Sequence, residues 1–224
     1  MNCIGIITAM EVEALLIKKE MAELEMVEYA GVIYCKGMIR GKNVVLLTCG
    51  IGKVNAAIYT QILIDKFQVN TIIHTGIAGS MDDKVKHLSL VVGLDLTYYD
   101  VRKEQMINWF PKQSTFKSDA SLVELLMKNA PKDTLQGLIV TGDDFISERS
   151  KKEKIKQNYQ EALCIEMEGS AVAHTAFVNK VPFVVIRCIS DLADNSADID
   201  YENFERQAAD KVGTVVLNTI YTMV

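Results

Sequence analysis

Short, uninterrupted apolar runs alternate along this chain with segments in which apolar residues recur at helical spacing. The runs CIGIIT, TIIHTGIAG and PFVVIRCIS are typical of strands that are buried on both faces of a sheet. The segments from about Met10 to Leu24, GIGKVNAAIYTQILIDKF and SDASLVELLMKNA have the period of amphipathic helices. This alternation predicts an α/β protein whose sheet is covered on both faces.

The other segments complete the predicted order of elements. A hairpin is expected over VIYCKGMIRGKNVVLLTCG, with its turn near Arg40-Gly41. Strands are also expected at LSLVVGLDLTYYDV and LQGLIVTGDDF, a polar helix at SKKEKIKQNY, and a strand ALCIEME before the helix GSAVAHTAFVNK. A last helix should end at Val224. The predicted fold class is a three-layer α/β/α sandwich with a central mixed, largely parallel sheet, and 224 residues favour a single domain over 1–224.

Composition narrows the possible functions. A net charge of −5 argues against binding to nucleic acid, because neutralising phosphates requires a basic surface. No apolar window reaches the roughly 18 residues of a membrane span, and Glu11 and Glu13 interrupt the N-terminal stretch too early for a signal peptide. The five cysteines stand singly in apolar runs without Cys/His ligand spacing, which indicates reduced thiols in a cytoplasmic protein and no metal site.

Carboxylates follow three of the predicted strands, at the positions where open α/β sheets collect their ligands. After the first strand, Thr8 and Glu11 have the spacing of a capping box, so Glu11 is expected to reach back to the helix start. Glu13 is then left near the helix N-terminus, facing either solvent or the cleft. Ser190 and Asp191 follow another strand, where a helix cap or turn is their alternative role.

A pair of glutamates at the end of a third apolar strand is unusual, because burying carboxylates without partners is costly. Alternation places Glu166 and Glu168 on one side of the strand and Met167 on the other, unless both glutamates simply begin the next helix. Arg187 lies inside an apolar run and needs a carboxylate partner, for which Glu166 is a candidate. That pairing would leave Glu168 and Asp191 for a ligand.

Three further segments have less specific patterns. CGIGKV and HTGIAGS each follow a strand, and their glycines allow either close approach of the backbone to a ligand or tight strand-to-helix packing. The stretch Arg102–Ser118 is the least regular of the chain and holds Trp109 and Phe110-Pro111. We expect it to form a lid or a loop that contacts a partner.

The blocks IGIITAMEVE, CGIGKVNAA, HTGIAGS, GDDFI, CIEMEGSAVAH and VPFVVIRCISDLAD, in this order, resemble the methylthioadenosine/S-adenosylhomocysteine nucleosidases of the purine nucleoside phosphorylase-like superfamily. The resemblance runs nearly end to end, and AMEVE, EMEG and SDLAD together are quite specific. It implies the nucleoside phosphorylase/hydrolase fold and an N-ribosyl hydrolase that cleaves adenine from 5′-methylthioadenosine and S-adenosylhomocysteine, in S-adenosylmethionine recycling and methionine salvage. It also implies a homodimer in which a partner loop, here around Met106–Pro111, closes the 5′ pocket.

The resemblance also implies roles for individual residues. Glu13 would activate the attacking water, and Asp191, assisted by Ser190, would protonate the imidazole ring of adenine. Glu168 would bind the ribose hydroxyls. The other implied substrate-binding residues are Met167 beneath the sugar, Phe145 stacking on the base, Ile146 binding its edge through the backbone, and Met10, Ile51 and Tyr201 around the 5′ and sugar pockets.

These residue types suit the reaction, because a transition state resembling an oxocarbenium ion can be met by carboxyl groups on both sides of the sugar. Asp191 ends an apolar strand, a setting that favours its neutral, proton-donating form. Glu13 lies near a helix N-terminus, a setting that favours its anion. No group in this scheme requires a metal or a cofactor.

Alternative functions stay open at this point. A phosphorylase would hold phosphate with arginines, whereas this chain has the acidic AMEVE loop and places His74 before TGIAG. Ile77, Arg102 and Lys103 depart from the family pattern, which leaves room for another 5′-modified adenosine such as 5′-deoxyadenosine or aminofutalosine. A sensor that binds nucleosides without cleaving them is the third alternative, although it would have no use for Glu13.

Overall fold

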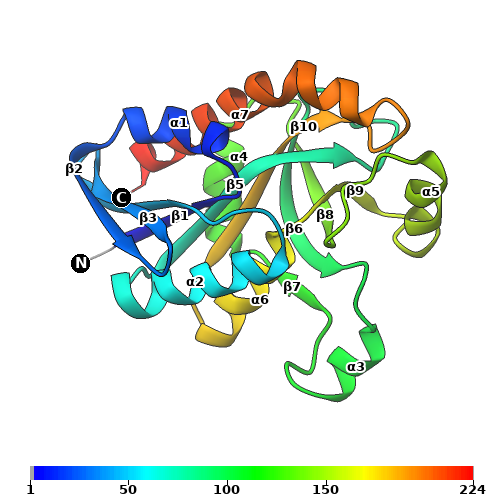
Figure 1. Cartoon of the computed structure of the whole chain (residues 1–224), viewed down its shortest axis with the longest axis horizontal. Helices are drawn as coiled ribbons and strands as arrows, with labels where there is room; N and C mark the ends of the chain where they lie inside the picture. The colour runs from blue at the N-terminus through cyan, green and yellow to red at the C-terminus, as the bar shows by residue number, and fades with distance from the viewer. Residues whose placement is uncertain (1–2, 224) are drawn as a thin grey trace.

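A mixed sheet of ten strands forms the centre of the computed structural model, which describes residues 3–223 (Figure 1). The strands are β1 (Cys3–Thr8), β2 (Ala22–Tyr29), β3 (Val32–Ile39), β4 (Lys42–Thr48), β5 (Thr71–Ser80), β6 (Leu90–Tyr98), β7 (Thr115–Lys117), β8 (Leu135–Thr141), β9 (Ala162–Glu166) and β10 (Phe183–Asp191). The helices are α1 (Glu11–Lys19), α2 (Lys53–Phe67), α3 (Lys103–Asn108), α4 (Ala120–Asn129), α5 (Arg149–Asn158), α6 (Gly169–Asn179) and α7 (Ala197–Thr222). The predicted α/β class with a central mixed sheet is confirmed.

The sheet closes on itself along part of its length. Its order is β10-β6-β8-β9-β5-β1-β4-β3-β2, with β7 on β6, and β10 also pairs with β5. The long strand β5 therefore has three neighbours: it runs parallel to β1 and β10 and meets β9 antiparallel at its last residues. In this register Asp191 lies opposite Gly79, and Gly79 lies opposite Ile165. The ends of β10 and β9 thus meet on either side of the end of β5.

The two largest of the three apolar cores lie on opposite faces of the sheet. Helices α2 and α6 contact each other on one face, where Ala56, Leu63 and Ala173 are buried against the strands. On the other face α7 packs beside α1 and α4, with Ile17, Leu126 and Val212 buried. Alanines at these contacts let the helices approach the sheet closely. Among the described residues, none of the helices combines the length and the apolar character needed to cross a bilayer.

The N-terminal helix is shorter than its pattern predicts. We expected it to run from about Met10 to Leu24, but α1 ends at Lys19 and β2 follows from Ala22. Strand β2 pairs only with β3 and is exposed along almost its whole length, so it lacks the buried alternation by which strands are detected. The predicted hairpin is confirmed as β3 and β4, with Arg40-Gly41 in its turn.

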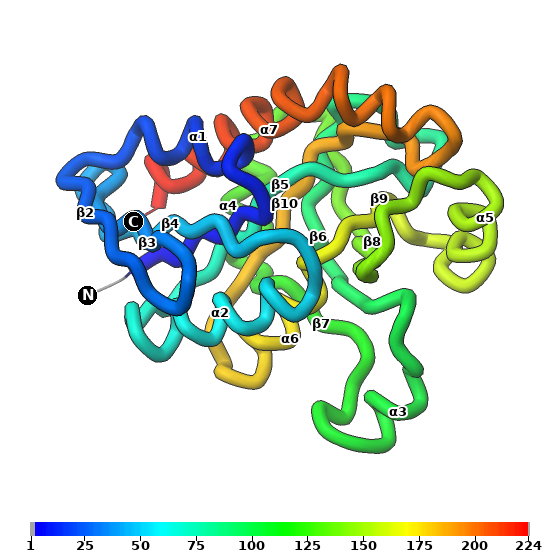
Figure 2. The backbone as a smooth tube through the Cα atoms, in the orientation of Figure 1, coloured from blue at the N-terminus to red at the C-terminus, as the bar shows by residue number. Residues whose placement is uncertain are grey.

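The irregular stretch Arg102–Ser118 contains the short helix α3 and the short strand β7. Strand β7 anchors it to β6, whereas α3 extends away from the body of the protein (Figure 2). Trp109 and Phe110 are 71% and 76% exposed there, whereas Met106, Pro111 and Phe116 are buried. This projecting segment, which we call the α3 arm (residues 101–114), joins the core of its own chain through Met106 but leaves Trp109 and Phe110 exposed.

Arg187, on β10, is the largest fully buried side chain. Its guanidinium donates to the Glu166 carboxylate at the end of β9 and to the ring of His74 on β5, so the predicted partnership with Glu166 is confirmed. A charged group in this position needs a compensating charge, because the protein interior solvates it poorly. The pair therefore joins strands of the closed part of the sheet.

Replacing Glu166 with Leu should lower the free energy of unfolding by about 3–5 kcal/mol, because Arg187 would stay buried without its main partner. The exposed pair between Lys36 and Glu25, 2.8 Å apart, is the matched control, and Glu25→Leu should cost no more than about 1 kcal/mol. Urea unfolding of the wild type and both variants measures the difference. Equal losses in the two variants would contradict the structural importance of the buried pair.

Candidate active site

A cavity of about 480 Å³ opens where β1, β5, β9 and β10 end. The start of α7 and the loop after β8 complete its wall. Every site residue predicted from the sequence lines it: Met10, Glu13, Ile51, Phe145, Ile146, Met167, Glu168, Ser190, Asp191 and Tyr201. Residues from widely separated parts of the chain are thus brought to one place.

Glu13 reaches into this cavity from the first turn of α1 and is almost completely buried. Its Oε2 accepts hydrogen bonds from the amides of Ala9 at 2.9 Å and Met10 at 3.0 Å, and its Oε1 accepts one from Ile77 at 2.9 Å. Glu13 therefore performs the helix-capping function that the spacing of Thr8 and Glu11 had assigned to Glu11, and that prediction is wrong. One carboxylate both caps α1 and links it to β5.

Two opposing effects act on the charge of Glu13. Burial is the larger effect and raises the pKa of Glu13, while the charge of Arg187 and the three backbone N–H donors offset part of that rise. The expectation that the helix N-terminus favours the anion is thus only part of the balance. The donors that favour the ionised form are fixed by the backbone, so the Glu13 carboxylate stays oriented whether or not a ligand is present.

Glycines make room for the acidic side chains. A Cβ atom on Gly76 would collide with Glu13 Oε1 and lie 3.1 Å from Nη1 of Arg187. A Cβ atom on Gly79 would lie 2.8 Å from Oδ1 of Asp191. The segment HTGIAGS lies inside β5 rather than in a turn after a strand, so its glycines admit protein side chains to the cavity.

Asp191, the last residue of β10, is buried on the opposite side of β5 from Glu166. Its Oδ2 accepts a hydrogen bond from the Ser190 hydroxyl at 2.8 Å, and its Oδ1 accepts one from the Ala193 amide at 2.9 Å. Burial raises the pKa of Asp191, and the nearby negative charge of Asp200 raises it further. Asp191 thus accepts fewer backbone N–H groups than Glu13 and faces a like charge, which favours its neutral form.

Glu168 stands at the start of α6, with its carboxylate toward the first glycine-rich loop. Its Oε1 accepts a hydrogen bond from the Gly52 amide at 2.8 Å, and its Oε2 lies 3.8 Å from Arg187. Gly52 has a φ of 100°, which glycine adopts readily and other residues rarely do. Burial and the neighbouring Glu166 raise the pKa of Glu168. One oxygen of Glu168 is left to face the cavity or Arg187.

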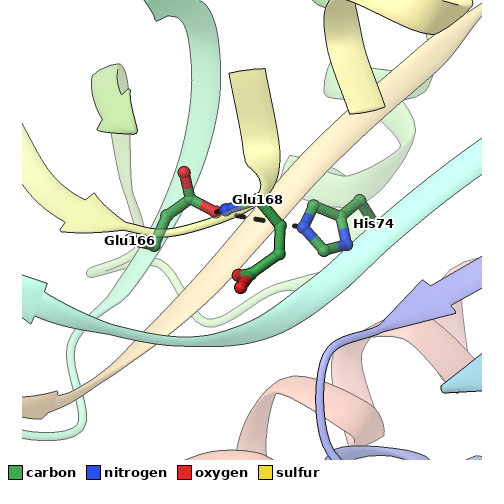
Figure 3. Close-up of side chains that lie close together, drawn as sticks. All are labelled: His74, Glu166 and Glu168. Atoms are coloured by element: carbon green, nitrogen blue, oxygen red, sulfur yellow. Dashed lines mark hydrogen bonds and ion pairs between the residues drawn. The ribbon is translucent and has the colours of Figure 1, made fainter. Parts of the chain in front are cut away.

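His74, Glu166 and Glu168 form the one group of side chains among residues 3–223 with the spacing of metal ligands (Figure 3). Arg187 lies among them and donates to Glu166 and His74, so a guanidinium holds the position that a metal ion would need. Burial and Arg187 lower the pKa of His74 well below its ordinary value, and Nδ1 lies 3.0 Å from the Ile7 carbonyl. The group is thus better described as a buried ion-pair cluster than as a metal site.

Apolar side chains form another wall of the cavity. The Tyr201 hydroxyl lies 3.0 Å from the sulfur of Met10, and the Tyr201 ring meets Phe145 edge to face with centroids 5.9 Å apart. Phe145 and Ile51 remain partly exposed, whereas Ile146 is buried. These side chains offer a flat apolar surface and a narrow slot beside the acidic groups.

Some lining residues were not predicted from the sequence. Ala78 belongs to β5, and Asp144, Asp198 and Glu202 lie in the loop after β8 and at the start of α7. The acidic stretch after Asp191 is visible in the sequence, but nothing in its spacing shows that helix α7 turns it toward the cavity. Lys103, which departs from the family pattern, lies over an aromatic ring of its own chain, with its Nζ 4.2 Å from the centre of the Tyr159 ring.

Comparison with known proteins agrees with this geometry. The sequence profile described as Phosphorylase superfamily matches residues 3–220. The 5′-methylthioadenosine/S-adenosylhomocysteine nucleosidase of Staphylococcus carnosus is 37% identical over 227 residues, which cover 98% of this chain and 100% of the relative.

Solved structures extend the similarity to three dimensions. The nucleosidase of the same name from Neisseria meningitidis, solved in complex with methylthio-immucillin-A, superposes with a TM-score of 0.95 at 31% identity, covering 100% of both chains. Futalosine hydrolase of Helicobacter pylori superposes with a TM-score of 0.92 at 26% identity, covering 99% of this chain and 98% of the other. The chain belongs to the phosphorylase superfamily and, within it, to the family of 5′-methylthioadenosine/S-adenosylhomocysteine nucleosidases.

Proposed function

We propose that this protein hydrolyses the N-glycosidic bond of 5′-methylthioadenosine and S-adenosylhomocysteine, releasing adenine for S-adenosylmethionine recycling and methionine salvage. The observation that carries the proposal is the convergence of Glu13, Glu168 and Asp191 on one cavity with different surroundings for each carboxyl group. Relatives that cover 98% and 92% of the chain carry the same activity in their names.

Asp191 is the general acid of the proposed reaction. Adenine leaves poorly as an anion, so a proton has to reach its imidazole ring as the glycosidic bond breaks. Burial raises the pKa of Asp191, which favours its protonated, proton-donating form. The Ser190 hydroxyl, 2.8 Å away, fixes the orientation of this carboxyl group.

Glu13 is the general base that activates the attacking water. Its three backbone donors and the charge of Arg187 favour the ionised form that can take a proton. Nη1 of Arg187 is buried, has no hydrogen-bond partner among the described residues, and flanks Gly76 together with Glu13. A water molecule between these two groups would satisfy the guanidinium and lie beside the base.

The other lining residues bind the substrate. Glu168 accepts hydrogen bonds from the ribose hydroxyls, and Met167 lies beneath the sugar. Phe145 stacks on adenine, and the backbone of Ile146 binds the edge of the base. The apolar group of Met10, Ile51 and Tyr201 surrounds the 5′ substituent, and a methylthio group suits this surface because it is small and uncharged.

The charges of the cavity also bear on the alternatives. Among the described residues that line it, the charged ones are all acidic: Glu13, Asp144, Glu166, Glu168, Asp191, Asp198 and Glu202. A phosphate dianion would meet like charges there. A sensor would gain nothing from a buried carboxylate poised to activate water. Hydrolysis of a 5′-substituted adenosine therefore suits this lining better than phosphorolysis or binding without cleavage.

We extend the proposal to the setting in which the enzyme works. Residues 1–224 act as a single nucleoside phosphorylase-like domain in the cytoplasm, without metal or cofactor and without a nucleic-acid partner. The family match over 3–220 and the single sheet that runs from β2 to β10 support one domain.

A homodimer is the proposed assembly. Val54 and Ile58 on α2 are 68% and 49% exposed, and the α3 arm exposes Trp109 and Phe110. None of residues 102–111 lines the cavity of its own chain, so the arm is free to close the 5′ pocket of a partner. Large exposed apolar side chains of this kind are typical of protein interfaces.

Glu13→Gln and Asp191→Asn should each lower turnover of 5′-methylthioadenosine by about 10²-fold or more, because each removes a proton-transfer group while keeping its shape. In the wild type, kcat/KM should fall at acidic pH as Glu13 becomes protonated and at alkaline pH as Asp191 loses its proton. Raised pKa values shift both limits upward. Adenine release measured across pH tests both assignments. Glu11→Gln, an exposed neighbour on α1, is the control and should keep wild-type turnover. More than a tenth of wild-type rate in either variant would remove that residue from its role.

Truncating both Trp109 and Phe110 to Ala should weaken the dimer and raise KM for 5′-methylthioadenosine more than KM for adenosine, which has no methylthio group for the arm to cover. Light scattering and steady-state kinetics measure the two effects. Met26→Ala serves as control, because Met26 is similarly exposed but lies on β2, away from the cavity. A monomeric wild type, or equal effects on both substrates, would show that the arm does not close a partner's pocket.

A further inference from the structure

The loop between β5 and β6 contacts the start of α7 through a histidine that the proposed reaction does not use. The ring of His87 stacks on Phe204, with centroids 4.6 Å apart and planes inclined by 22°. Its Nε2 lies 3.1 Å from Oδ2 of Asp200, and both side chains are largely covered. Two side chains of α7 are thus held by one residue of the loop.

Neighbouring contacts fix the same region of α7. Oδ2 of Asp200 also accepts a hydrogen bond from the Ser196 hydroxyl at 2.6 Å, within the first turn of the helix. One residue beyond His87, the Leu88 carbonyl accepts a hydrogen bond from Nζ of Lys211 at 2.8 Å. The loop is thus joined to α7 by the hydrogen bond from Lys211 and by the contacts of His87, whose partner Asp200 is itself fixed within the helix by Ser196.

The region held in this way supplies part of the cavity wall. The neighbours of Asp200 on this helix line the cavity: Asp198, Tyr201 and Glu202. Tyr201 also reaches across to Met10 and Phe145 on the facing walls. A shift of the first turns of α7 would therefore widen the substrate slot.

Asp200, and His87 in its protonated form, also act on Asp191 through their charges. Asp200 raises the pKa of Asp191, whereas His87 lowers it. The other groups that face Asp191 are the Ser190 hydroxyl beside it, Lys152 from α5 and Tyr201 from α7. The clamp thus places two groups with opposite effects near the proposed general acid.

We propose that His87, Asp200 and Phe204 form a clamp that positions the first turns of α7 over the cavity, and that His87 and Asp200 are positioning residues for the nucleosidase reaction. This inference rests on the proposed function. Neither residue contacts the reacting atoms; each acts through the helix that carries Tyr201 and through the environment of Asp191.

His87→Ala should raise KM for 5′-methylthioadenosine about tenfold, the equivalent of losing one aromatic stack with its polar contact, while kcat changes less. His174→Ala is the matched control. The His174 ring stacks on Phe116 with the same centroid distance of 4.6 Å, but it lies on α6 and does not line the cavity. The control variant should keep the wild-type KM even if its melting temperature falls as far as that of His87→Ala.

The pH profile separates positioning from general loss of stability. Asp200→Asn removes a charge that raises the pKa of Asp191, so the alkaline limb of kcat/KM should move to lower pH. His87→Ala removes a group that lowers the same pKa, so the limb should move to higher pH. Damage to the fold alone would not move the two limbs in opposite directions.

Calorimetric binding of adenine to the same variants distinguishes the two proposals, because it does not depend on turnover. A wild type that binds adenine but releases none from 5′-methylthioadenosine would overturn the proposed function. The clamp would still stand if His87→Ala bound adenine several-fold more weakly than His174→Ala. The clamp would be overturned if both His87→Ala and Asp200→Asn kept the wild-type KM, the wild-type affinity for adenine and the wild-type position of the alkaline limb.

Discussion

The guanidinium of Arg187 lies inside the closed part of the sheet and faces the buried carboxylates of Glu166, Glu168 and Glu13. Without this cation, three acidic groups would lie close together in an interior that solvates charge poorly. They would then become protonated or turn toward solvent. Glu166 forms the direct ion pair with Arg187. Its carboxylate also accepts hydrogen bonds from the amides of Glu168 and Gly169 at the start of α6. The ion pair therefore sets where α6 begins, and with it the position of the Glu168 carboxylate.

Closure of the sheet converts this local constraint into an active site. Because β10 and β9 both meet the end of β5, Asp191 and Glu166 lie on either side of one strand, and the glycines of that strand leave space for the carboxyl groups. Glu13 then reaches the cavity from α1 and is fixed by the backbone of β5. In this cavity Glu13 accepts hydrogen bonds from three backbone N–H groups, whereas Asp191 accepts one. This difference in surroundings suits chemically similar groups to the roles of base and acid.

Much of this arrangement follows from the sequence. The α/β alternation, the Arg187–Glu166 pair and the location of carboxylates after strands all rest on local patterns, and the structure brings the predicted site residues to one cavity. Other features depend on contacts between distant segments. Closure of β10 onto β5, the capping of α1 by Glu13 rather than Glu11, and the pairing of His87 with Asp200 leave no periodic signal. Strand β2 was missed because it is exposed on both faces and therefore shows no alternation.

The proposed reaction requires that water, rather than phosphate, is the nucleophile in the acid-lined cavity. The most direct test supplies the purified protein with 5′-methylthioadenosine in the presence and absence of inorganic phosphate, and follows adenine release together with the sugar product by phosphorus NMR and mass spectrometry. We expect the same rate in both buffers, free methylthioribose as the sugar product and no new phosphate ester. A rate that requires phosphate, with a sugar 1-phosphate as the product, would contradict the account.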